Sequence, residues 1–151
     1  MRRYVTMSGA TLNRADCSGV EGFVRDALGC ACPPGVFGDI RLENDPAGFP
    51  GIPGTRLLTI GGRLLVLLVD GGAAGMSAPL ISDLLHRGRE LRDSGGFNRF
   101  RLVIVAPQEG AARKPAVIDP DSVVTADERL HLHTIAPSQL PALLRTPAEV
   151  Q

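Results

Sequence analysis

The clearest pattern along the chain is a pair of apolar runs, TRLLTI and RLLVLLVD, joined by Gly61 and Gly62. Two β-rich runs separated by two glycines are typical of a tight hairpin, because its primed turn requires the positive φ angles that glycine adopts. The second run is apolar on both faces, which predicts a central strand covered on both sides of a sheet. We therefore predict a central β-hairpin over residues 55–69.

A helix and another apolar strand follow the hairpin. The strand RLVIVAP occupies residues 101–107, and the sequence SGG at 94–96 predicts the end of the helix before it. The apolar residues of this helix recur at the spacing of one helical face; they are Leu80, Ile81, Leu84, Leu85 and Leu91. A strand, a helix and a second apolar strand in this order predict a parallel β-α-β crossover over residues 63–106.

Weaker periodic patterns flank this central unit. Ser18 and Glu21 have the spacing of a capping box, and they open an apolar helical face that ends at Gly29. The segments DIRLEN and ERLHLHTI alternate as strands, and SQLPALLR predicts a short closing helix. Residues 1–16 carry no clear period, which predicts a flexible N-terminal arm.

Together these elements predict an α/β protein of the mixed α+β kind. We expect a single domain over residues 17–151, with two or three layers. Its core is one mixed sheet of about four to six strands, carrying the hairpin and the crossover, with flanking helices packed on it.

Composition narrows the class of protein without indicating one function. Hydrophobic residues make up 44% of the 151 residues, and the 16 basic and 16 acidic residues give a formal net charge of zero. A neutral chain with 4% aromatic residues lacks the basic field and the stacking groups of nucleic acid binding, so we expect no nucleic acid partner. The longest apolar run, LLVLLV at 64–69, is too short to span a membrane, so we expect no membrane partner.

Cysteine and lysine usage bear on where the protein works. The chain has three cysteines, an odd number, and no apolar run follows Arg2 and Arg3. These features favour a reducing compartment over a secreted disulfide framework, so we expect a cytoplasmic, bacterial protein. Only one basic residue, Lys114, is a lysine, and the arginines are spread along the chain, which indicates a genomic coding bias.

Two cysteines one residue apart, Cys30 and Cys32 in LGCACPPG, form the first candidate site. They follow a predicted helix C-terminus, which raises the pKa of a thiol, whereas a helix opened by Pro33 and Pro34 would lower it. A disulfide across this spacing closes a small, strained ring that is easily reduced, which favours a catalytic or sensing pair. The alternative is that both cysteines only pack at a chain corner.

The second candidate site is the histidine pair in the strand segment HLH. Alternate residues of a strand share one face, so His131 and His133 are expected to project together while the leucines beside them face the core. With Cys30 and Cys32 they form a candidate four-ligand set for zinc or iron. The usual CxxC and HxxxH spacings are absent, and an exposed histidine pair on an edge strand needs no metal. Further candidate ligands are Cys17 and His86.

The third candidate site is the glycine-rich turn VDGGAAGMS, between a buried strand and a helix start. At this position an open α/β sheet binds a phosphate or a nucleotide through free backbone N–H groups. The candidate residues are Gly71, Gly72 and Gly75, although a dinucleotide fingerprint would need glycine where the chain has Asp70. The alternative is a flexible connection whose glycines only permit tight turns.

These sites lead to two functional hypotheses from different classes. The first is a thiol-based redox or soft-metal-binding protein, in which the cysteine pair acts with His131 and His133. The second is a non-catalytic α/β module that binds a protein partner or forms a homo-oligomer. No spacing selects a catalytic triad, and zero net charge does not oppose association. For such a module, Phe49 and Ile52 in the loop AGFPGIPG are the expected apolar contact.

Overall fold

The computed structural model describes most of the sheet and both long helices. It covers residues 10–12, 14–29, 34–44, 46, 55–71, 78–106 and 129–144. The predicted thiol pair Cys30 and Cys32, the loop residues Phe49 and Ile52, and Gly72 and Gly75 lie outside these described residues.

One mixed six-stranded sheet forms the centre of the molecule, and its strand order follows the chain. The strands are β1 (Ala10–Thr11), β2 (Ile40–Asn44), β3 (Arg56–Ile60), β4 (Leu64–Asp70), β5 (Arg99–Val105) and β6 (Leu130–Ile135). Strands β1 to β4 pair antiparallel with their neighbours, whereas β4 pairs with β5, and β5 with β6, in parallel. The predicted mixed sheet with a hairpin and a parallel crossover is confirmed.

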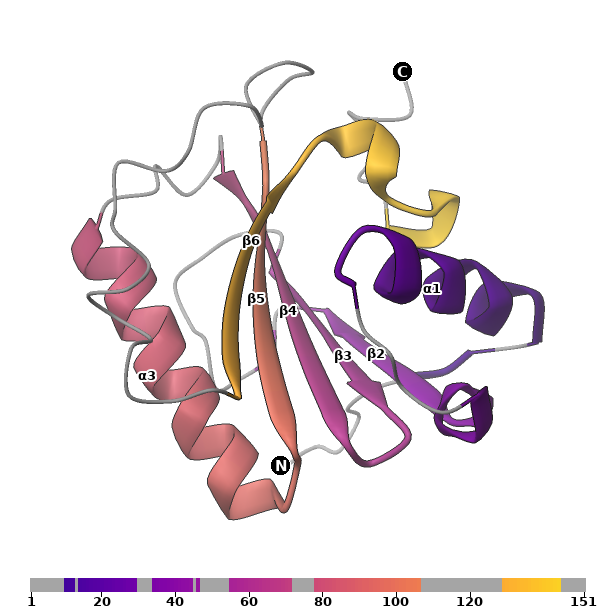
Figure 1. Cartoon of the computed structure of the whole chain (residues 1–151), viewed down its shortest axis with the longest axis horizontal. Helices are drawn as coiled ribbons and strands as arrows, with labels where there is room; N and C mark the ends of the chain where they lie inside the picture. Colours follow the sequence, from indigo (N-terminus) through magenta and orange to yellow (C-terminus); the bar gives the residue numbers. More distant parts are fainter. Residues whose placement is uncertain are drawn as a thin grey trace.

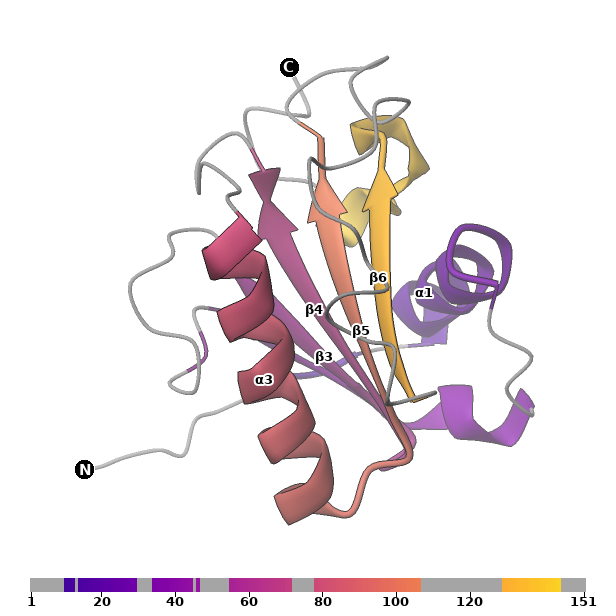
Figure 2. The same cartoon turned by 60° about the vertical axis from the view of Figure 1, so that its left-hand side comes forward.

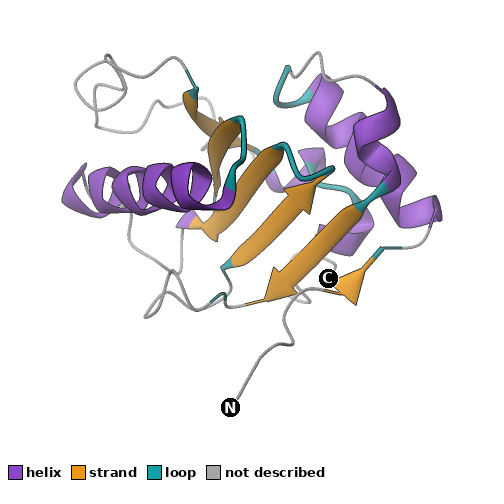
Figure 3. Cartoon of the chain, turned by 90° about the horizontal axis from the view of Figure 1, so that it is seen from below, coloured by secondary structure: helices purple, strands orange, loops and turns teal. Residues whose placement is uncertain are grey.

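The two long helices lie on opposite faces of the sheet, so the domain has three layers (Figures 1 and 2). Helix α1 (Arg14–Asp26) covers one face, and helix α3 (Ala78–Gly95), which connects β4 to β5, covers the other. Figure 3, in which the chain is seen from below, also shows helices on either side of the strands. Three short 3₁₀ helices complete the α1 layer: η2 (Pro34–Gly38), η4 (Pro137–Gln139) and η5 (Ala142–Leu144).

The hairpin turn has the geometry that its two glycines predict. Gly61 and Gly62 have φ angles of 60° and 67°, and the Arg63 amide donates a hydrogen bond to the Ile60 carbonyl at 3.0 Å. Positive φ at both central residues defines the primed turn whose twist matches the flanking strands. Every residue from Leu64 to Val69 is buried, as expected for a strand covered on both faces.

Two hydrophobic clusters fill the spaces on either side of the sheet. On the α3 side, the helix residues Ile81, Leu84 and Leu85 are each 1% exposed, and they pack against strand residues such as Phe100. Gly88 allows this close approach, because a Cβ atom there would lie 2.2 Å from the Phe100 ring. The α1 side holds alternate strand residues such as Val103, beneath the apolar face of α1.

The structure corrects two element boundaries. Helix α1 begins at Arg14 instead of Ser18, so residues 14–16 of the predicted flexible arm are helical, and Ala10–Thr11 pairs with β2. The predicted closing helix divides into η4 and η5, because Pro141 has no N–H to donate and favours an extended residue before it. Leu140 accordingly has φ −78° and ψ 141°.

Candidate functional site

Four basic side chains share the α1 face of the sheet at the parallel strands β5 and β6. Arg99 and Arg101 lie on β5, and His131 and His133 lie on β6. Alternate residues of each strand continue into the hydrophobic cluster beneath α1, which fixes the face on which these four residues lie. We call Arg99, Arg101, His131 and His133 the basic row.

Each arginine of the basic row contacts one of its histidines. Arg101 Nη1 lies 2.9 Å from His133 Nε2, and Arg99 Nη1 lies 3.2 Å from His131 Nε2. The two imidazole rings stack with their centroids 6.3 Å apart. Arg101 Nη1 also donates a hydrogen bond of 2.9 Å to the carbonyl of Leu28, just after helix α1. The row is therefore joined to the end of α1 through one guanidinium.

Burial and neighbouring cations lower the pKa of two groups of the basic row, His133 and Arg101. Burial, and after it the charges of Arg101 and His131, together lower the pKa of His133 to about 4. His133 is therefore neutral near pH 7, and its Nε2 lone pair accepts a hydrogen bond from Arg101. Burial, and then the charge of Arg99, lower the pKa of Arg101 itself, but a guanidinium stays protonated in proteins.

Arg101 is a buried cation whose charge no described carboxylate balances. Its exposed fraction is 6%, and its Nε atom has no hydrogen-bond partner within the described residues. The ion pairs found in the described part of the chain use other arginines: Arg25, Arg41, Arg87 and Arg92. A buried donor without an acceptor costs about 1–3 kcal/mol, and a buried charge without a counter-charge costs several kcal/mol more.

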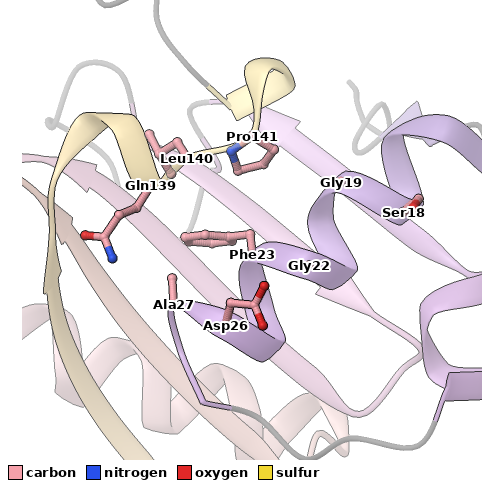
Figure 4. A pocket seen from close by; sticks show the side chains of 9 residues that line it. All are labelled: Ser18, Gly19, Gly22, Phe23, Asp26, Ala27, Gln139, Leu140 and Pro141. Carbon is pink, nitrogen blue, oxygen red and sulfur yellow. The ribbon is translucent and has the colours of Figure 1, made fainter.

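A cavity of about 480 Å³ lies between α1 and the segment 139–141, and no residue of the basic row lines it (Figure 4). Its walls are largely apolar, with Phe23 pointing across the space toward Gln139. Gly22 faces open space, since a Cβ atom there would meet nothing within 4 Å. The charged lining side chain is Asp26, so the cavity itself offers no positive charge to an anion.

The prediction that His131 and His133 share one face of their strand is confirmed. His131 and His133 project to the same side of β6, and Leu130 packs into the core on the other side. The structure places one guanidinium group against each imidazole, and these charges oppose the approach of a metal cation. Within the described ranges, no group of three or more His, Cys, Asp or Glu side chains is placed to hold a metal ion.

The remaining predicted site residues are placed as follows. Gly71 follows β4 directly and is half-buried, and its partners in the predicted phosphate turn lie outside the described residues. Cys17 is buried in α1, where its Sγ donates to the Leu12 carbonyl at 3.6 Å. His86 is exposed on α3, on the opposite face of the sheet, so Cys17 and His86 do not form one site.

The sequence interpretation missed Arg99 and Arg101. The sequence pattern predicts an apolar strand over residues 101–107, and the spread of arginines along the chain indicates only a coding bias. The signal was present in the segment RFRLVIV, where two arginines at a spacing of two residues lie on one face of an otherwise apolar strand.

Comparison with known proteins identifies no relative: no family model matches the chain, and no curated protein and no solved structure is significantly similar to it. Neither of the described long helices is apolar enough along its length to cross a membrane.

Proposed function

We propose that the chain is a non-catalytic binding module whose basic row holds an anionic group of a partner. The observation that carries this proposal is Arg101, a guanidinium that is 6% exposed, has an unpartnered Nε and has no described carboxylate beside it. An anion at this point would supply both the missing acceptor and the missing charge. Hydrogen bonds between a guanidinium and a carboxylate or phosphate are roughly twice as strong as neutral ones.

The protonation state of the histidines can change when an anion binds. In the free protein, the neutral His133 accepts a hydrogen bond from Arg101, and His131 Nε2 lies 3.2 Å from Arg99 Nη1. A bound anion favours protonated imidazole, because opposite charges stabilise each other within a few ångströms. Binding is therefore expected to raise the pKa of His133 above its free value of about 4, so affinity for the anion should increase as the pH falls toward 4.

The direct test measures stabilisation by simple anions. Inorganic phosphate and succinate are titrated into the protein while thermal unfolding is followed by circular dichroism. A ligand that binds only the folded state at 100 times its Kd raises stability by about 2.7 kcal/mol. We expect Arg101→Met to fold and to lose this stabilisation.

The matched control is Arg87→Met. Arg87 lies on α3, on the other face of the sheet, and pairs with Asp83 at 2.9 Å on the surface. We expect this variant to respond to both anions like the unmodified protein. Equal stabilisation of the unmodified protein and Arg101→Met would contradict the proposal, because general salt effects do not depend on one buried guanidinium.

A thiol-based or metal-binding function is the second candidate, and one observation favours it. Arg101 contacts both the Leu28 carbonyl and His133, so Leu28, two positions before Cys30, shares one guanidinium with a predicted histidine ligand, and the charge of that guanidinium favours the thiol form of this candidate over the metal form. Native mass spectrometry tests it: a mass excess of zinc or iron that is lost on unfolding supports a metal site. Free thiols without bound metal or a disulfide favour the binding module.

A further inference from the structure

Strand β6 is the last strand of the described sheet, and no described strand pairs with its outer edge. The Phe100 amide donates to the Arg129 carbonyl at 3.0 Å, and the Ala106 amide donates to the Ile135 carbonyl at 2.9 Å. Since successive peptide groups of a strand point to opposite sides, the odd-numbered residues of β6 bond to β5. The N–H and C=O groups of Leu130, Leu132 and Thr134 consequently point away from it.

These outward backbone groups have no partner in the described part of the chain. The described sheet has no strand beyond β6, and the backbone bonds of residues 129 and 135 run to β5. An open edge with three outward residues is long enough to pair with an extended segment of about five to seven residues. Pairing of this kind is a common way for a sheet to bind a peptide.

The two faces beside this edge have opposite chemistry. On the α1 face, an added strand would lie beside His131 and His133, with Arg99 and Arg101 one strand further in. On the α3 face, it would lie beside the leucines of β6, of which Leu132 is only partly buried. The complementary segment is one that alternates acidic and apolar side chains.

The spacing along the edge agrees with this alternation. Residues two apart in an extended strand are about 6.6 Å apart, because each residue adds about 3.3 Å. The imidazole centroids of His131 and His133 are 6.3 Å apart. Carboxylates at alternate positions of an added strand therefore face His131 and His133 one for one.

We propose that the partner of this module is an extended acidic peptide segment that adds a strand to the outer edge of β6. The inference rests on the proposed function, since it assigns the anion of the basic row to carboxylates on that segment. Its backbone pairs with Leu130, Leu132 and Thr134, and its alternate carboxylates face His131 and His133. A second copy of the chain is a poorer occupant, because antiparallel pairing of two β6 edges would place two basic rows on one face.

The test compares three capped, fluorescent heptapeptides by anisotropy. The first alternates glutamate with valine, and the second has the same composition with its glutamates consecutive. The third keeps the alternating sequence but carries N-methyl groups on alternate amides, which removes strand pairing and preserves the charge. We expect the first peptide to bind at least tenfold more tightly than the other two.

Two further measurements locate the contact. Amide hydrogen exchange at Leu132 and Thr134 is expected to slow in the presence of the alternating peptide. Thr134→Pro removes one outward N–H from an edge strand, where proline is tolerated, and is expected to abolish peptide binding while leaving phosphate binding intact. If this variant does not fold, the N-methylated peptide still tests strand addition.

The outcomes separate this inference from the proposed function. Equal binding of the alternating and N-methylated peptides, with unchanged exchange at Leu132, would overturn strand addition and leave anion binding standing. A dimer of the unmodified protein that Thr134→Pro dissociates would replace the acidic peptide by a second copy. Failure of the peptides, phosphate and succinate alike would overturn the proposed function itself.

Discussion

Two glycines in helix interiors make a matched test of the packing between α3 and the sheet. Gly88 of α3 is buried, and a Cβ atom there would lie 2.2, 2.3 and 2.5 Å from three atoms of the Phe100 ring. Gly22 of α1 faces open space, where a Cβ atom would meet nothing within 4 Å. The perturbation is alanine at each position.

The expected free energies have opposite signs. Alanine is favoured over glycine in a helix interior by about 1 kcal/mol, so Gly22→Ala should raise the free energy of unfolding by about that amount. At Gly88 the same gain is offset by overpacking, which typically costs about 1–3 kcal/mol. Because three ring atoms lie under 3.0 Å from the new Cβ, we expect the upper end of that range and a net loss of about 2 kcal/mol.

Urea denaturation measures both variants on one scale. Their free energies of unfolding should differ by about 3 kcal/mol, which corresponds to roughly 6–12 °C in Tm for a chain of this size. Gly88→Ala should lose less stability in a Phe100→Leu background, because the smaller side chain removes the ring atoms that the methyl group meets. If Gly88→Ala is as stable as Gly22→Ala, α3 does not approach β5 as closely as described.

Three further outcomes are expected. The pKa of His133 is about 4 in the folded protein and 6.5 in the unfolded chain, so the unfolded chain binds more protons between these values and stability falls as the pH decreases from 6.5 to 4. The variant His133→Gln should therefore show a smaller change of the urea midpoint with pH over this range. An unchanged pH dependence would argue against the burial of His133. Cys17 is buried, so its alkylation should follow unfolding, and rapid modification under native conditions would contradict its position. Gly61→Ala should lower the Tm more than Gly62→Ala, because both glycines have positive φ but only at Gly61 would a Cβ atom lie 2.6 Å from Val36. Equal losses of Tm would count against the contact with Val36.

Local patterns predicted the fold well because its pairings are mostly local. The hairpin follows from Gly61 and Gly62, which supply two positive φ angles between apolar runs. The crossover follows from the apolar stripe of α3, and the shared face of His131 and His133 follows from strand alternation. The predicted start of α1 at Ser18 was wrong, because the residues with capping-box spacing lie within the helix, which begins one turn earlier at Arg14.

The candidate site could be predicted only in part, because its contacts join distant segments. Arg101 touches His133, 32 residues away, and Leu28, 73 residues away. Periodicity determines the face on which a side chain lies, but only the pairing of β5 with β6 brings these residues together. Burial of Arg101 also depends on the placement of α1, which no local pattern specifies.

The strand order of the sheet has a consequence for how the module forms. Since each strand pairs with the next one along the chain, the β3–β4 hairpin closes a very short loop, whereas β6 joins β5 only across residues 106–129. Closing the longer loop costs more chain entropy, so β6 is expected to dock late in folding and to detach early in local opening. The basic row is then complete only while β6 is paired with β5. A ligand that contacts both strands would therefore stabilise the part of the sheet that opens most readily.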